Sequence, residues 1–127
     1  MVITLYAGLL GFIYVGLTFF TIKGRFKHRV GLGDGGNEDM ARRIRMHGNF
    51  AEYVPMALIL IFLVELSDFS EALIHGLGMA LVLGRVLHAM GVYNVAPINK
   101  ARQIGMVLTL SVIIVGSVLV LWSYLAG

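Results

Sequence analysis

The side chains most able to do chemistry lie in one short stretch, ARRIRMHGNFAEYVP at residues 41–55, which an apolar run follows. On a helix, spacings of three, four and three residues put its polar members on one face: Arg42, Arg45, Asn49 and Glu52. Ionisable groups carried into a membrane are costly, and they usually face a protein interior or a wet cavity. The stripe therefore predicts a polar site. The alternative is interfacial anchoring with an Asn–Glu–Arg link between helices, and Arg42 and Arg43 fit anchoring better.

A second polar face occurs further along the chain, where Arg85 and His88 are three residues apart in an apolar segment. Tyr93 lies near the end of that segment, and Arg102 near the start of the next. We expect both faces and Arg102 to meet at one site near one membrane surface. Simpler interpretations stay open. Arg85 would pair with Glu52 or extend to the interface, and for His88 we favour an interhelical hydrogen bond.

These residue types suit a small zwitterion that carries more than one carboxylate and an ammonium group. Arginines hold carboxylates through paired hydrogen bonds, and Glu52 would meet the ammonium. An arginine beside a bound thiol favours the thiolate, which is the reactive form. The chain has no cysteine, so that thiol must arrive with a substrate. An apolar second substrate would enter from the bilayer.

The other polar residues predict no metal or phosphate site. The histidines are scattered without a metal-binding spacing. His47 lies off the stripe and is expected at the interface, while His28 and His75 have no evident partners. The segment GLGDGG neither follows a strand nor precedes a Gly-Lys-Ser/Thr, so we interpret it as a flexible turn. No nucleic-acid partner is expected.

Composition indicates that membrane spans hold these residues. Of the 127 residues, 58% are hydrophobic and 13% are charged, whereas soluble domains carry about 25% charged residues. Segments 2–22 and 103–127 contain no charge, and each is long enough for the ~30 Å hydrocarbon core. A further span begins near Asn37 and runs through the apolar segment 53–64, and another covers roughly 70–93.

We therefore predict an all-α integral membrane protein, in which residues 1–127 form a single domain of four transmembrane helices. Asn37 is suited to cap the second helix, because two acidic residues follow it. The fourth helix is expected to begin near Asn99 or Lys100, after a connection that contains Pro97. The first segment lacks a basic leader and a small-residue cleavage site, so we expect a retained span.

The charges divide between the two ends of such a bundle. All ten lysines and arginines lie at or toward the first and third connections. The second connection carries Glu65, Asp68 and Glu71 instead. The positive-inside rule then places the first and third connections in the cytoplasm and both termini outside. Residues 24–40 are interpreted as the only true loop, made pliable by glycines.

The stretch RMHGNFAEYVP resembles the Arg-x-x-x-Asn-x-x-Glu-Tyr-x-Pro pattern of the MAPEG family, the membrane-associated proteins in eicosanoid and glutathione metabolism. GRVLHAMGVY and NKARQIG resemble the family's third span and the start of its fourth, in the same order. The short first connection is most similar to the bacterial branch. The resemblance implies a homotrimer of four-helix protomers, with glutathione bound between neighbouring subunits near the cytoplasmic face. It also implies a bacterial inner-membrane location.

The resemblance implies roles for individual residues. The positions that match or resemble the family's glutathione contacts are Arg25, Arg45, Asn49, Glu52, Tyr53, Arg85, His88 and Tyr93. Among them, Arg25 matches a basic residue that contacts a glutathione carboxylate. Arg102 matches the arginine credited with stabilising the thiolate, so it is the expected catalytic residue. Gly48 stands where some catalytic members carry another arginine.

Two functions follow as hypotheses. The first is a glutathione transferase, with a peroxidase-like variant, that conjugates glutathione to an apolar electrophile taken from the bilayer. The second is a non-catalytic scaffold of the same fold that binds lipid or a partner protein, in which the polar stripe joins subunits. A small transporter is a third interpretation, which the absence of an internal repeat and of broken spans disfavours.

Overall fold

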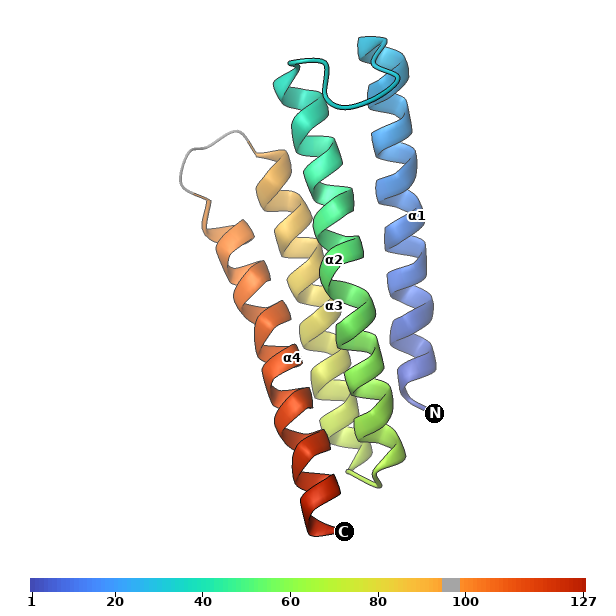
Figure 1. The fold of residues 1–127 in the computed structure, drawn as a ribbon, viewed down its shortest axis with the longest axis vertical. Helices are drawn as coiled ribbons and strands as arrows, with labels where there is room; N and C mark the ends of the chain where they lie inside the picture. Colours follow the sequence, from blue (N-terminus) through green and yellow to red (C-terminus); the bar gives the residue numbers. More distant parts are fainter. Residues whose placement is uncertain (95–98) are drawn as a thin grey trace.

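The computed structural model describes residues 1–94 and 99–127, and it is built from long helices (Figure 1). The helices are α1 (Ile3–His28), α2 (Glu38–Leu66), α3 (Glu71–Tyr93) and α4 (Lys100–Ala126). All four are long and apolar enough to cross a membrane. The prediction of an all-α fold with four spans is therefore confirmed.

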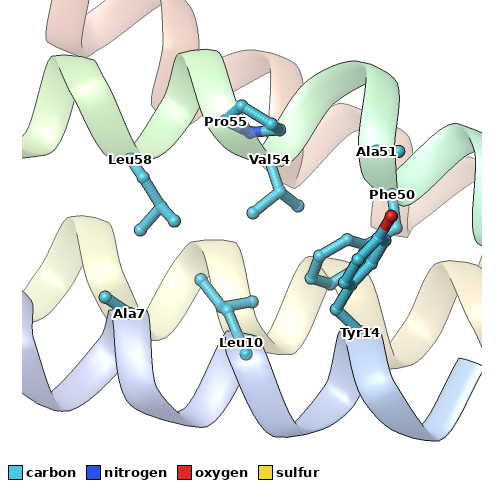
Figure 2. Close-up of a pocket in the computed structure, with 9 residues that line it drawn as sticks. Ala7, Leu10, Tyr14, Phe50, Ala51, Val54, Pro55 and Leu58 are labelled. Carbon is cyan, nitrogen blue, oxygen red and sulfur yellow. The ribbon is translucent and has the colours of Figure 1, made fainter. Parts of the chain in front are cut away.

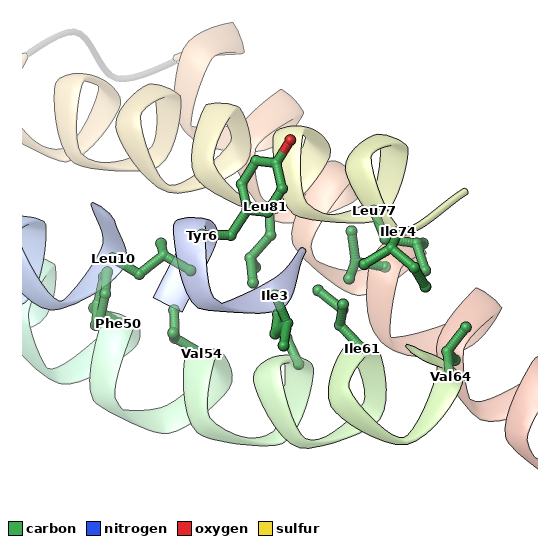
Figure 3. Close-up of a cluster of buried hydrophobic side chains, with 12 residues drawn as sticks. Ile3, Tyr6, Leu10, Phe50, Val54, Ile61, Val64, Ile74, Leu77 and Leu81 are labelled. Atoms are coloured by element: carbon green, nitrogen blue, oxygen red, sulfur yellow. The ribbon is translucent and has the colours of Figure 1, made fainter. Parts of the chain in front are cut away.

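The helices run antiparallel to their chain neighbours, and both termini lie at the same end of the bundle (Figure 1). Helix α2 packs against each of the other three, and the α3–α4 contact is the most extensive. A buried apolar core lies toward the end with the termini, where Ile3, Tyr6 and Leu10 of α1 meet α2 and α3 (Figure 3). This core leaves the opposite half of the bundle for the polar residues.

Side-chain caps fix where three helices begin. The Asn37 carboxamide oxygen accepts a hydrogen bond from the Met40 amide at 2.9 Å, which confirms the predicted start of α2. Asn99 caps α4 in the same way, so the predicted start there is also confirmed. Ser70 caps α3. Pro97, which the sequence placed in the third connection, lies outside the described residues.

The first connection is shorter than predicted, because α1 continues to His28 and α2 begins at Glu38. Residues 24–40 are thus not all loop, and only 29–37 connect the helices. The basic residues continue α1 because lysine and arginine are good helix formers and favour the negative end of the helix dipole. Gly24 suits this helix, since a Cβ there would lie 2.4 Å from the Arg43 Cδ on α2.

Two histidines that looked unpartnered in the sequence have partners in the fold. His28 Nε2 lies 2.7 Å from an Asp39 carboxylate oxygen, which also accepts a hydrogen bond from Arg43. His75 Nδ1 lies 2.6 Å from the Tyr6 hydroxyl, across the α1–α3 contact. Both pairs join different helices. Sequence periodicity could not reveal them, because it describes one helix at a time.

The charge separation predicted from the sequence exists in space. The α1–α2 connection and the start of α4 lie toward one end of the bundle, and the termini and the α2–α3 turn at the other (Figure 1). At the latter end, the Glu65 carboxylate accepts hydrogen bonds from the Val2 and Ile3 amides at the start of α1. An acidic group there satisfies amides that have no partner within the helix. Which end faces the cytoplasm stays a prediction.

Candidate functional site

Arg85 is a guanidinium enclosed in the bundle, with 2% of its surface exposed. Its Nη2 donates a hydrogen bond of 2.7 Å to the Asn49 carboxamide oxygen on α2 and lies 3.5 Å from His88 Nδ1. The guanidinium carbon lies 5.7 Å from the centre of the Phe50 ring. Nε and Nη1 have no hydrogen-bond partner within residues 1–94 and 99–127. The positive charge of Arg85 is therefore not neutralised there by an acidic side chain.

Glu52 pairs with Arg45, so the interpretation in which Arg85 pairs with Glu52 is wrong. Arg45 Nη1 and Nη2 donate to the two Glu52 carboxylate oxygens at 3.2 and 3.3 Å. The residues stand two turns apart on α2, which a long arginine side chain spans along one helix face. Gly48 lies between them, and a Cβ there would sit 3.3 Å from Arg45 Nη1. A larger side chain at position 48 would therefore crowd this ion pair.

A hydrogen bond joins the two polar faces, because Asn49 of α2 accepts from Arg85 of α3. Tyr53, Arg45 and Arg102 lie within electrostatic range of the buried Arg85 and His88. The fold thus brings polar residues of α2, α3 and α4 toward one another. We call this set the polar cluster: Arg45, Asn49, Glu52, Tyr53, Arg85, His88 and Arg102.

Glycines at the contact between α3 and α4, which we call the glycine seam, place Arg102 near His88. A Cβ on Gly91 would lie 2.3 Å from the Arg102 backbone nitrogen, and one on Gly105 would lie 2.5 Å from the His88 backbone nitrogen. Asn99 adds a hydrogen bond of 2.7 Å from its side-chain amide to the Gly91 carbonyl. Small residues let two membrane helices approach this closely. Sequence reasoning missed this seam, whose signal is glycine at 84 and 91 in α3 and at 105 in α4.

Replacing Gly91 with alanine is expected to push α4 away from α3 and to displace Arg102. The obstacle is backbone, which cannot move aside as a flexible side chain does. We expect a loss of about 1–3 kcal/mol of stability, seen as a lower midpoint of thermal unfolding in detergent. Gly76→Ala is the matched control on the same helix, because nothing lies within 4 Å of its added Cβ. Equal midpoints for the two variants would contradict the seam.

Two expected ligand contacts are engaged elsewhere in the single chain. Arg25 Nη1 donates to the Val30 and Gly33 carbonyls of the first connection at 3.3 and 3.0 Å. Tyr93 is 63% exposed, and its ring centre lies 5.9 Å from that of Phe20 on α1. The structure therefore does not bring either side chain into the polar cluster. Within the described residues, no three His, Cys, Asp or Glu side chains group as metal ligands would.

An apolar groove of about 460 Å³ lies between α1 and α2 (Figure 2). Tyr14 and Phe50 lie at one end with stacked rings, 5.4 Å apart, and Leu58 lies toward the other. The His47 ring stacks on the Tyr14 ring, with 4.9 Å between the ring centres. Its Nε2 lies 3.1 Å from the Thr18 hydroxyl. His47 is thus outside the polar cluster, as predicted. Phe50 lines the groove and also contacts Arg85.

Comparison with known proteins agrees with this architecture. The family model described as the MAPEG family matches residues 3–122. The chain belongs to the MAPEG family. This MAPEG protein is 34% identical to Inner membrane protein YecN of Escherichia coli strain K12 over 94 residues, which are 74% of this chain and 72% of that protein. The protein of the same name from Escherichia coli O6:H1 strain CFT073 matches to the same extent. The chain is therefore an integral membrane protein of this family.

Proposed function

We propose that this MAPEG protein binds glutathione at the polar cluster and transfers it to an apolar electrophile that enters from the bilayer. The observation that carries the proposal is the buried Arg85, whose charge has no acidic partner within the described residues. A buried charge without a counter-ion is costly, and such groups inside membranes usually mark ligand sites. The polar cluster is therefore suited to binding an anion.

The charges of the cluster fit this ligand. Arg45, Arg85 and Arg102 bring three positive charges and Glu52 one negative charge, so the cluster carries a net charge of +2 with His88 neutral. Glutathione has two carboxylates and one ammonium, and its thiolate adds a further negative charge. A zwitterion can also exchange partners with the Arg45–Glu52 pair, which is more than half exposed. Arg45 would take a carboxylate and Glu52 the ammonium, so neither is left unpaired.

Asn49 is oriented for a role in binding. Its carboxamide oxygen accepts from Arg85, so its NH₂ group remains a donor for a ligand carboxylate. Arg85 thus acts on the ligand in two ways, by its charge and by holding Asn49. Tyr53 and His88 line the same cluster, and a second subunit would have to supply Arg25 and Tyr93, which lie outside the cluster within one chain.

Arg102 is the residue proposed to hold the thiolate. It lies in the first turn of α4, where the helix dipole also favours a negative charge. That first turn contains no acidic residue to oppose it. When bound, glutathione supplies the nucleophile: its sulfur bonds to the electrophilic carbon, a leaving group such as halide departs with the bonding electrons, and the thiol proton passes to solvent. Arg102 keeps the sulfur ionised before the attack.

The groove between α1 and α2 is proposed to admit the apolar substrate (Figure 2). Its lining is mostly aliphatic and aromatic, which suits a molecule dissolved in lipid. Phe50 lines the groove, and its ring also lies near the Arg85 guanidinium. An electrophile in the groove would thus lie near the Arg85 side of the polar cluster.

We also propose that the protein is a homotrimer in a bacterial inner membrane. One stripe of α2 is exposed along its length in the single chain: Arg45, Glu52, Met56, Ile59, Leu63 and Leu66. Charged groups of a spanning helix face protein or water rather than lipid, so a second copy is the natural cover for the Arg45–Glu52 end. Native mass spectrometry of the purified protein tests the trimer directly.

Conjugation by the purified protein tests the function. The full chain in detergent would be mixed with glutathione and an apolar chromogenic aryl halide, and product formation would be followed by absorbance. We expect saturable turnover above the uncatalysed rate and competition by S-methylglutathione. A protein that binds glutathione without turnover would not be a transferase, and one that does not bind it would favour the lipid- or partner-binding scaffold.

A further inference from the structure

The groove between α1 and α2 contains a polar side chain to which the proposed function gives no role. Among the described residues that line the groove, Tyr14 alone has a polar group in its side chain. Its ring is fixed by stacking on those of His47 and Phe50, at 4.9 and 5.4 Å between ring centres. Its hydroxyl, however, makes no hydrogen bond within residues 1–94 and 99–127. The Tyr14 hydroxyl is therefore held in place without an internal partner.

A second polar group of the groove is a backbone carbonyl of α2. Pro55 lies inside this helix, and proline has no N–H to donate to the carbonyl four residues earlier, which is that of Ala51. Ala51 and Pro55 both line the groove, so the freed carbonyl lies on the groove side of α2. No side chain in the described part of the chain donates to this oxygen. The Ala51 carbonyl is thus an acceptor that a ligand can use.

Both groups lie near the middle of membrane-spanning helices. At 1.5 Å per residue, Tyr14 lies about 17 Å from the start of α1, and Ala51 lies about 20 Å from the start of α2. Tyrosines of spanning helices are enriched instead at the membrane interfaces, where water satisfies the hydroxyl. The hydrocarbon core offers no water, so an unsatisfied hydroxyl or carbonyl there costs free energy. A ligand that forms hydrogen bonds with both groups would remove this cost.

The two groups are complementary to a hydroxyl on the ligand. A carbonyl oxygen only accepts hydrogen bonds, whereas a tyrosine hydroxyl can also donate one. Figure 2 shows the Tyr14 ring reaching from α1 toward α2, with its hydroxyl oxygen on the α2 side of the groove. The remaining wall is apolar and includes Leu10, Val54 and Leu58. Apolar walls with a few polar groups are typical of sites that orient a small ligand.

We propose that the groove selects apolar molecules that carry a hydroxyl group. The ligand oxygen accepts from the Tyr14 hydroxyl and donates to the Ala51 carbonyl, while the apolar body packs on Leu10 and Leu58. Tyr14 and Pro55 then determine specificity, Pro55 because it leaves the carbonyl free. The use of the groove by a substrate rests on the proposed function, to which the hydroxyl group of that substrate is the addition.

Three matched compounds test this selection: 1-decanol, methyl nonyl ether and undecane. They have the same number of non-hydrogen atoms, but the alcohol donates and accepts, the ether only accepts, and the hydrocarbon does neither. The full chain in micelles would be dialysed to equilibrium against each compound without glutathione, and empty micelles would correct for partitioning. We expect the natural chain to bind the alcohol most tightly and undecane least, with about fivefold between successive compounds, the size of one net hydrogen bond.

Two variants remove the two hydrogen bonds separately. Tyr14→Phe removes the donor, so it should abolish the preference for the ether over undecane. Pro55→Ala restores an N–H for the Ala51 carbonyl, so it should abolish the preference for the alcohol over the ether, and its helix should be at least as stable. Tyr124→Phe is the matched control at an exposed position near the end of α4, and it should keep both preferences.

Several outcomes would overturn the proposal. One is equal binding of the three compounds by the natural chain, and another is both preferences persisting in Tyr14→Phe and Pro55→Ala. A variant that loses all three compounds alike would indicate a change in the shape of the groove, and it would contradict the assigned hydrogen bond. Neither glutathione nor an electrophile is present, so a failure here leaves the transferase proposal standing, and an absence of conjugation leaves this binding measurable.

Discussion

Arg102→Ala is expected to reduce conjugation at neutral pH by roughly 25-fold, if Arg102 lowers the pKa of the bound thiol by about two units from ~8.5. Glutathione binding should change much less, because Arg45, Asn49 and Glu52 remain in place. The measurement is steady-state conjugation together with equilibrium binding. A loss of affinity that fully accounts for the loss of rate would contradict the assigned role.

The pH dependence sharpens this prediction. In the natural protein the thiol is already ionised near neutral pH, so the rate should be flat as pH rises. In Arg102→Ala the rate should rise with pH until the thiol ionises unaided, and the difference between the two should disappear. Arg102→Lys retains a positive charge and should lie between them. Parallel pH profiles for all three proteins would show that Arg102 does not act on the thiol.

Arg85→Met is expected to weaken glutathione binding while changing the stability of the protein little. Replacing a buried charge by an apolar side chain is often neutral or stabilising, but here it leaves the Asn49 oxygen without its donor, at a cost of about 1–3 kcal/mol. The thermal unfolding midpoint should therefore change little. Glutathione affinity should fall at least about tenfold, which corresponds to about 1.4 kcal/mol, because the positive charge and the fixed Asn49 are both lost.

A double variant provides the control for Arg85. In Arg85→Met with Asn49→Leu the unpaired Asn49 oxygen is removed as well, so this protein should be more stable than the single variant while binding no better. Calorimetry of unfolding and of glutathione binding would measure both quantities. If Arg85→Met unfolds readily and yet binds glutathione normally whenever folded, Arg85 is a structural residue and the observation that carries the proposed function is removed.

The sequence was enough to predict the spans and the members of the polar cluster. Two uncharged segments and two apolar segments with polar residues in them predicted the four helices. Asn37 and Asn99 predicted two helix starts, because a cap acts within one turn. Helical spacing put Arg45 and Glu52 on one face and Arg85 with His88 on another. These are local properties, so one sequence contains them.

The pairing between helices could not be predicted in the same way. Glu52 forms its ion pair with Arg45 rather than with Arg85. The partner depends on how far α3 is shifted along α2. The Gly91 contact with Arg102 depends on the same kind of interhelical register. Helix α1 ends later than the sequence predicts for a different reason. Its basic residues suggest a loop, but they are also suited to the last turn of a helix.

The most direct test of the account is a titration of the purified full chain with glutathione, followed by calorimetry and by the ultraviolet absorbance of the thiolate. We predict saturable binding with thiolate absorbance that grows in proportion to occupancy at neutral pH. Arg102→Ala should retain the binding heat and lose the absorbance, and Arg85→Met should lose much of the heat. Absence of saturable heat in the natural protein would contradict the glutathione site, and binding without thiolate absorbance would contradict the transfer chemistry.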